Sequence, residues 1–234
     1  MRYLALLLLA RSAAAGPTSY GWLPATELAP AGKVELGGSI YERSDRGDIH
    51  ERATVLAGAP TFGASDRFEL RIPFELTWRT AIDTAPAFGF TRYGAEGRYR
   101  FTRRDAELAS IIRFGLFRDV LVRTLGRAEL GGALSFARGP IHVEGAADVV
   151  AEVNIGLRHF EIHPGIGASV GVVDELRLGA ELYAEVSLDN ITSTWVVVGP
   201  NIAWHLGPSW LSGAFGIGVV GIGFAPRLNW GLAW

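Results

Sequence analysis

The chain has no cysteine, no large excess of either charge, and few apolar runs long enough to form a membrane-spanning helix. The absence of cysteine among its 234 residues excludes a disulfide scaffold and a cysteine-ligated zinc site. Basic residues number 22 and acidic residues 24, so a basic surface that binds nucleic acid is not expected. Hydrophobic residues make up 49% of the chain, which excludes disorder. The mean hydropathy of +0.22 is typical of a membrane protein and conflicts with the shortage of helical spans.

Residues 1–15 have the pattern of a secretory signal peptide. Arg2 supplies the positive start, and residues 3–10 form an apolar core that is too short to span a bilayer. The three alanines that end at Ala15 form a small-residue cleavage site, so the mature chain is expected to begin at Gly16. The alternative is an ordinary buried first helix. Export without cysteine means that disulfides do not stabilise the mature protein.

The mature chain reads as strands, because apolar residues recur at every second position. In residues 68–78, Phe68, Leu70, Ile72, Phe74, Leu76 and Trp78 alternate with mostly polar residues. Successive side chains of a strand point to opposite faces, so this segment has one apolar and one charged face. Its length fits a tilted transmembrane strand of about 9–11 residues. Pro73 cannot donate a ladder hydrogen bond and is expected at an edge or a bulge.

The same pattern recurs along the chain and is separated by turn residues. It predicts about twelve strands, with ten as the alternative count. The predicted strands are residues 32–42, 48–58, 66–79, 88–102, 106–118, 124–137, 140–157, 159–172, 175–189, 191–206, 209–218 and 222–234.

These strands fit an all-β, antiparallel, up-and-down transmembrane barrel over residues 32–234 better than a soluble sandwich. Sandwich strands are about five or six residues long, and cores do not leave Arg and Glu unpaired. In a barrel the apolar face meets lipid, the charged face meets a wet lumen, and closure satisfies every backbone group. The positive hydropathy then needs no helical span.

Aromatic residues near strand ends predict two girdles at the membrane interfaces. The predicted interface aromatics are Trp78, Phe88, Phe101, Phe136, Trp204, Trp230 and Trp234.

The signal peptide and the last strand give the chain its resemblance to Gram-negative outer-membrane β-barrel proteins, with no single family indicated. In the last strand, apolar residues occupy every second position up to a terminal tryptophan. The residues on which the resemblance rests are Leu228, Trp230, Leu232 and Trp234. The resemblance implies a location in the bacterial outer membrane after cleavage near Ala15. It also implies two partners, the lipid bilayer and the barrel assembly machinery that reads this final segment.

The charge pattern suggests what the lumen does. Residues 67–127 hold twelve arginines and seven acids, a net of +5, whereas residues 140–190 hold two arginines and nine acids, a net of −7. Folded into a barrel, these blocks would form a basic and an acidic arc that partly face each other across water. The predicted pore-lining residues are Arg71, Glu75, Arg79, Arg92, Glu96, Arg98, Arg100, Arg113, Glu144, Asp148, Glu152, Glu181 and Glu185.

Three functions remain open from the sequence. The first is a narrow, porin-like channel for passive diffusion of ions or small polar solutes, without a cofactor. The second is a closed structural barrel, because Arg and Glu could pair and fill the interior. The third is a rim enzyme that acts on lipid, in which Ser135, His142 or His163 would take part.

Residues 16–31, which include Tyr20, Trp22, Pro24 and Pro30, could lie in the periplasm or plug the lumen.

Two other motifs compete with the barrel. The apolar run 210–226 could be one transmembrane helix, but five internal glycines cost about 1 kcal/mol each relative to alanine. Gly216, Gly218 and Gly221 match a dinucleotide fingerprint, yet no acidic residue follows as that site requires.

One cluster has the residue types of a metal site. His159, Glu161 and His163 share a strand face and could ligate zinc, although a polar luminal cluster without metal is the favoured interpretation.

Overall fold

The computed structural model describes residues 18–45, 52–81, 84–120, 126–154 and 157–234. The predicted signal peptide and its cleavage site near Ala15 lie outside these ranges. The described elements are β1 (Val34–Asp45), β2 (Arg52–Ser65), β3 (Phe68–Arg71), β4 (Phe74–Ala81), β5 (Thr84–Arg100), β6 (Leu108–Asp119), β7 (Gly126–Arg138), β8 (Ile141–Asn154), β9 (Leu157–Val173), β10 (Leu176–Ser187), the 3₁₀ turn η1 (Ile191–Ser193), β11 (Trp195–Leu206), β12 (Ser209–Val220) and β13 (Ile222–Ala233).

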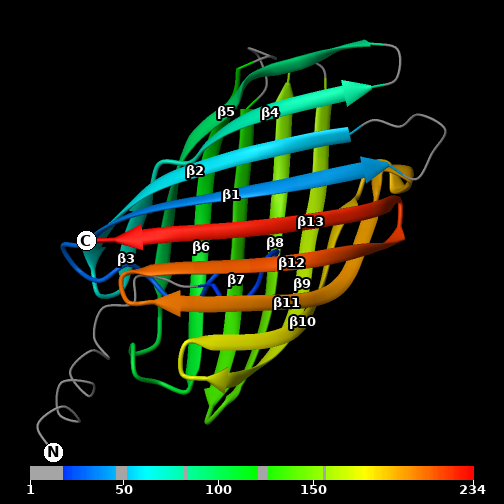
Figure 1. Ribbon diagram of the computed structural model, residues 1–234. Helices are drawn as coiled ribbons and strands as arrows, with labels where there is room; N and C mark the ends of the chain where they lie inside the picture. Colours follow the sequence, from blue (N-terminus) through cyan, green and yellow to red (C-terminus); the bar gives the residue numbers. More distant parts are fainter. Residues whose placement is uncertain (1–17, 46–51, 82–83, 121–125, 155–156) are drawn as a thin grey trace, which may run out of the picture.

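The strands form one closed antiparallel barrel (Figure 1). Apart from β3 and β4, which do not pair with each other, each strand pairs with its neighbours in the sequence, and β1 closes the sheet by pairing with both β13 and β2. β3 and β4 both pair with β2 and β5, so they are two parts of one strand of the wall. The barrel therefore has twelve strands around its circumference, as the alternation predicts.

The break between β3 and β4 falls at Ile72 and Pro73, inside the predicted strand 66–79. Proline has no N–H to donate, and the ladder is interrupted there. Two backbone bonds still cross the break: Ile72 N–H donates to the Pro60 carbonyl at 2.9 Å, and Gly94 N–H donates to the Pro73 carbonyl at 2.9 Å. The strand formed by β3 and β4 therefore remains hydrogen-bonded to both β2 and β5 despite the proline.

The largest difference from the predicted boundaries is β2, which covers Arg52–Ser65 instead of residues 48–58. The Gly, Pro and Ser residues of 58–65 indicate a loop when read locally. In the barrel they pair with β1 and β3, and the hairpin turns after Ser65 instead. Long-range pairing thus outweighs the local turn signals.

The two faces of the wall are chemically distinct. Leu70, Trp78, Phe114 and Leu116 are among the many large apolar side chains exposed on the outside. Glu69, Glu96 and Arg98, which occupy intervening positions, are buried inside. Within the described residues, no helix has the length and apolar character needed to cross a membrane.

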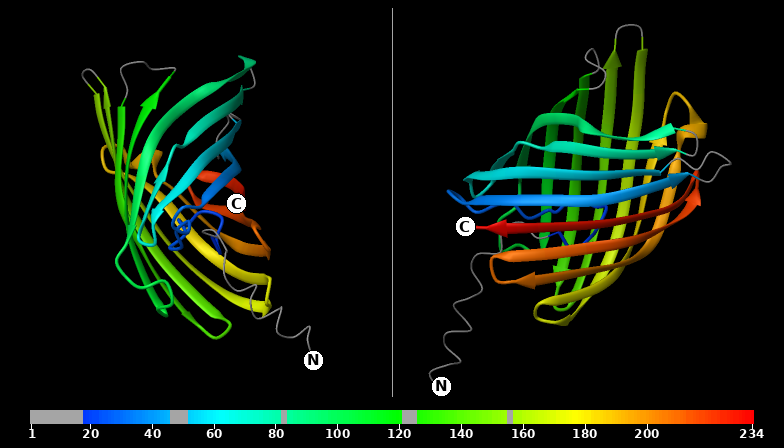
Figure 2. Two further views of the ribbon diagram at one scale, coloured as in Figure 1. Left: turned by 90° about the vertical axis from the view of Figure 1, so that its left-hand side faces the viewer. Right: turned by 45° about the horizontal axis from the view of Figure 1, so that its top comes forward.

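Residues 18–30 lie inside the barrel. Figure 2 draws them as a dark-blue segment that the strands of the wall enclose. Tyr20, Leu23, Leu28 and Ala29 are at most 3% exposed. Of the two locations open for this part of the N-terminal segment, the structure selects the lumen. We call residues 18–30 the plug.

Candidate functional site

The first half of the plug is held by polar side chains of the wall. Glu181 on β10 accepts the N–H groups of Gly21 and Trp22 at 2.8 and 3.0 Å. Asn229 donates to the carbonyls of Tyr20 and Gly21, and the Ser212 hydroxyl donates to the Tyr20 carbonyl at 3.1 Å. An irregular backbone inside a barrel needs such partners, since its own peptide groups are not paired in a ladder.

The second half of the plug is held mainly by charged side chains. Glu69 accepts the Ala29 N–H at 2.6 Å, and Arg98 donates to the Ala25 carbonyl. Arg104 donates to the Leu28 carbonyl at 2.9 Å. Arg100 forms an ion pair of 2.8 Å with Glu27 of the plug itself. These wall charges therefore satisfy the plug's backbone and its one described carboxylate.

Aromatic rings anchor the middle of the plug. The Trp22 ring stacks on Tyr183 with centroids 5.3 Å apart and meets Tyr41 and Trp195 edge-on at 5.7 and 5.5 Å. Tyr20 stacks on His142 at 5.6 Å, and its hydroxyl donates to the His142 carbonyl at 3.0 Å. Burial raises the pKa of the Tyr20 hydroxyl, so it remains a neutral donor.

Glycines in the wall make room for the plug. A Cβ at Gly167 on β9 would come within 2.4 Å of the Tyr20 ring, and one at Gly165 within 2.3 Å of Leu23 Cδ2. Any larger residue at either position would displace the plug or the strand. The wall and the plug are therefore complementary in shape.

A cavity of about 440 Å³ lies beside the plug and is lined by residues from both the plug and the wall. A second cavity of about 570 Å³ lies at the barrel end opposite the C-terminus and is lined by Arg43, Ala53, Arg79, residues 192–195, Gly221 and Ile222. Arg43 lines both cavities. We call that opposite end the distal mouth.

Ion pairs link the charges around the cavity. Arg113 on β6 contacts Asp148 at 2.5 Å, Glu96 at 3.5 Å and Glu129 at 3.6 Å. Further pairs join Arg71 to Glu96, Arg98 to Glu69, Arg92 to Glu75 and Glu152, Arg127 to Glu129 and Glu152, and Arg43 to Glu185.

This network changes the prediction of two facing arcs. Arg113 and Asp148 are separated by one intervening strand, and Arg92 on β5 and Arg127 on β7 both reach Glu152 on β8. The basic and acidic blocks thus meet in direct contact, rather than opposing each other across open water. A transverse field is weakened because six of the seven arginines that line the cavity form an ion pair with a carboxylate.

The predicted pore-lining residues fall into three groups. Nine line the cavity: Arg71, Glu75, Arg92, Glu96, Arg98, Arg113, Asp148, Glu152 and Glu185. Arg100 and Glu181 bind the plug, and Glu144 is buried directly across the β8–β9 ladder from Gly167. Arg79 is exposed and lines the cavity at the distal mouth.

Several lining residues are not among those predicted from the sequence: Trp22, Tyr41, Arg43, Glu69, Arg127, Glu129 and Arg227. Period-two alternation places Glu69 and Glu129 on the charged face, so that signal was available. Trp22 gives no such signal, because it belongs to no strand and reaches the lumen only through the fold of the plug.

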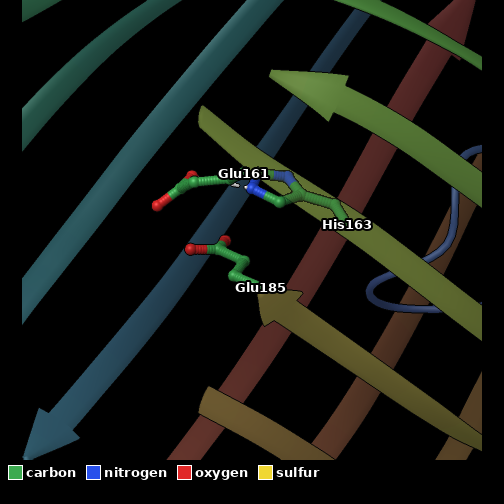
Figure 3. Close-up of side chains that lie close together, drawn as sticks. All are labelled: Glu161, His163 and Glu185. Atoms are coloured by element: carbon green, nitrogen blue, oxygen red, sulfur yellow. Dashed lines mark hydrogen bonds and ion pairs between the residues drawn. The ribbon is translucent and has the colours of Figure 1, made fainter. Parts of the chain in front are cut away.

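Two members of the predicted His–Glu cluster, Glu161 and His163, line the same cavity, and His159 is not among its lining residues. Figure 3 shows Glu161 and His163 beside Glu185. Glu161 and His163 on β9 and Glu185 on β10 have ligand atoms within 4.8 Å of one another. Glu161 is already bonded at 2.9 Å to both His159 and His163. Glu185 accepts from Arg43 at 3.2 Å and from the Trp195 indole at 2.9 Å. A metal ion would have to displace these partners. The arrangement therefore fits a cluster of polar side chains that bond to one another better than it fits a metal site.

Two of the three residues considered for a rim enzyme, Ser135 and His142, form hydrogen bonds with the plug, whereas His163 bonds to Glu161. The Ser135 hydroxyl lies 2.7 Å from that of Thr26, and His142 Nδ1 lies 3.2 Å from the Tyr20 hydroxyl. Among the described residues, Ser135 and His142 form no hydrogen bond with each other. A nucleophile needs such a bond to its base.

The predicted girdle and assembly residues lie on the outer face or at its ends. Exposed fractions are 54% for Trp78, 69% for Phe88 and 59% for Trp234. Phe101, Phe136, Trp204, Leu228 and Leu232 are also exposed, and Trp230 is half-buried against Gly38. Their roles at the membrane and in assembly stay predictions.

Comparison with known proteins gives matches only by structure, since no protein-family model and no curated protein matches the chain. An outer-membrane channel from Pseudomonas putida F1 superimposes with a TM-score of 0.65 at 12% identity, over 93% of this chain and 99% of that one. This chain has the fold of an outer-membrane β-barrel.

Two further structures show how widely this outer-membrane β-barrel fold is shared. The NanC porin has a TM-score of 0.55 at 9% identity, over 85% of this chain and 98% of its own. The translocator domain of the autotransporter NalP from Neisseria meningitidis has a TM-score of 0.54 at 13% identity, over 86% of this chain and 87% of its own. Identities this low establish the fold and leave the activity to be argued from the lumen.

Proposed function

We propose that the protein is a narrow channel of the bacterial outer membrane through which ions or small polar solutes diffuse passively. The observation that carries the proposal is the charged cavity of about 440 Å³ inside the closed barrel. Its lining of arginines and carboxylates can interact favourably with ions and polar solutes, whereas the apolar outer face suits lipid. The channel and porin folds among the structural neighbours support this function. The exported chain would reach the outer membrane through the barrel assembly machinery.

The plug sets the narrowest part of the proposed path. It occupies the lumen through hydrogen bonds to Glu69, Glu181 and Asn229 and through the Trp22 ring cluster. Solutes would pass around the seated plug or wait for it to move. Conduction should therefore be small in the intact protein.

Single-channel recording in planar lipid bilayers tests the proposal. The full mature chain is expected to show small conductance steps, and a chain lacking residues 18–30 is expected to show larger ones. Folding of both proteins is checked by their β-type circular dichroism. No steps from either folded protein at any voltage would contradict the channel function.

The second candidate is a closed structural barrel, and the plug is the observation that favours it. In that case the plug-deleted chain would conduct while the intact protein would stay silent at every voltage. We propose no enzymatic role. If purified protein does hydrolyse lipid, and the activity falls after His142→Ala, the rim-enzyme hypothesis would be restored.

A further inference from the structure

Arg227 differs from every other arginine that lines the cavity. The cavity-lining arginines are Arg43, Arg71, Arg92, Arg98, Arg113, Arg127 and Arg227. Six of the seven form an ion pair with a carboxylate. Among the described residues, Arg227 alone in this set has no carboxylate within ion-pair distance.

The guanidinium of Arg227 is nevertheless held in place. Its Cζ lies 5.1 Å from the ring centroids of both Trp22 and Tyr41. Its Nε donates to Asn229 Oδ1 at 3.1 Å, and Asn229 in turn binds the plug carbonyls. Two aromatic rings and one hydrogen bond thus restrain the position of the guanidinium. Its terminal Nη groups make no hydrogen bond to any part of the chain that the structure describes.

The carboxylates of this region are already engaged. Glu181 accepts the N–H groups of Gly21 and Trp22. Glu185 accepts from Arg43 and Trp195, and the Tyr183 hydroxyl lies 3.4 Å from it. Neither is free to neutralise Arg227 without giving up another donor, and an unpaired buried donor is costly.

We infer that Arg227 binds the carboxylate of a small organic anion that enters the cavity. A planar guanidinium offers two parallel N–H donors that match the two oxygens of a carboxylate. The Trp22 and Tyr41 rings beside it provide an apolar surface for the rest of the ligand. The cavity of about 440 Å³ lies within the size range of small-molecule sites.

The site requires the plug to be seated, because Trp22 forms one of its walls. Ligand binding and plug seating are therefore coupled through Trp22 and Asn229. The inference deepens the proposed function by naming organic carboxylates as a solute class, and it rests on that function for the route of entry. Binding itself can be measured without any conduction.

The probe is benzoate, with benzamide as its uncharged counterpart of similar shape. Ligand-observed NMR titration of the full, folded chain in detergent should give benzoate an affinity about tenfold or more above that of benzamide. Arg227→Gln should weaken benzoate binding about tenfold or more while leaving the weak benzamide binding unchanged. Arg227→Lys should bind benzoate with intermediate affinity, because an ammonium keeps the positive charge but lacks the two parallel N–H donors of the guanidinium.

Arg103→Gln is the control, since Arg103 pairs with Asp105 in an exposed turn outside the cavity. It should leave benzoate affinity unchanged. Equal benzoate binding by the parent chain and by Arg227→Gln would overturn the inference, and so would equal affinity for benzoate and benzamide or no benzoate binding at all. If benzoate binds as expected but bilayers show no conductance, the site stands and the channel function fails. If bilayers show conductance but benzoate binding does not depend on Arg227, the channel function stands and the site fails.

Discussion

Glu69 and Arg98 form an ion pair of 2.6 Å on the inner wall, and both residues also bind the plug. The second oxygen of Glu69 accepts the Ala29 N–H, and Arg98 donates to the Ala25 carbonyl. Their side chains are 2% and 6% exposed, so water contributes little to their solvation. The charges that the sequence places in the lumen therefore serve partly to hold a segment of the same chain.

Loss of Glu181 should loosen the first half of the plug. Glu181→Ala removes the acceptor of two buried N–H groups, and each unsatisfied group costs about 1–3 kcal/mol. We expect larger single-channel conductance and faster chymotrypsin cleavage next to Tyr20 and Trp22. Glu107→Ala, an exposed position between β5 and β6, is the control and should behave like the parent chain. Unchanged cleavage in Glu181→Ala would show that this carboxylate does not seat the plug.

A larger residue at Gly167 should expel Tyr20 from its site. In Gly167→Val the new Cβ would meet the Tyr20 ring at 2.4 Å, closer than nonbonded carbon atoms pack. We expect a larger single-channel conductance. We also expect stronger quenching of Trp22 fluorescence by acrylamide. Gly145→Val is the matched control, because the nearest atom to a Cβ at Gly145 is 4.0 Å away. The prediction fails if the two variants conduct alike.

Removal of Arg113 should destabilise the barrel. Arg113→Gln leaves the buried Asp148 carboxylate without its ion-pair partner, whereas Glu96 and Glu129 keep Arg71 and Arg127. Breaking a buried pair from one side costs about 3–5 kcal/mol, so urea unfolding in detergent micelles should shift to lower urea. Arg103→Gln, which breaks an exposed pair, should leave the unfolding midpoint in place. An unshifted midpoint for Arg113→Gln would mean that water solvates the cluster.

Trp234 is expected to act in assembly more than in stability. We propose that the assembly machinery reads the aromatic residue of the last strand, and Trp234→Ala should then lower the amount of folded barrel recovered from outer membranes severalfold. Protein refolded in detergent should unfold at nearly the same urea concentration as the parent. Trp78→Ala, which removes a similarly exposed ring from β4, should leave recovery unchanged. Equal losses in both variants would assign Trp234 to the girdle alone.

The candidate site could be predicted only in part. The inward direction of Glu96, Arg113 and Asp148 follows from alternation, because strand side chains point to opposite faces by geometry. Which arginine meets which carboxylate does not follow, since it depends on the registers of several strands. Arg227 stands out in the sequence as the one charged residue among residues 191–234. That its guanidinium has no carboxylate partner appears only once the partners of the other arginines are known.

The sequence by itself determined the barrel, a strand number of about twelve and the chemistry of its two faces. Those properties are local: a period of two, the length of each strand and the turn residues between strands recur along the chain. Even the division of one strand into β3 and β4 follows from a local property, the missing N–H of Pro73. Only the tertiary structure decided the position of residues 18–30. A segment without periodicity has no preferred face, and Trp22 and Tyr20 are placed by rings, glycines and carboxylates from strands far away in the chain.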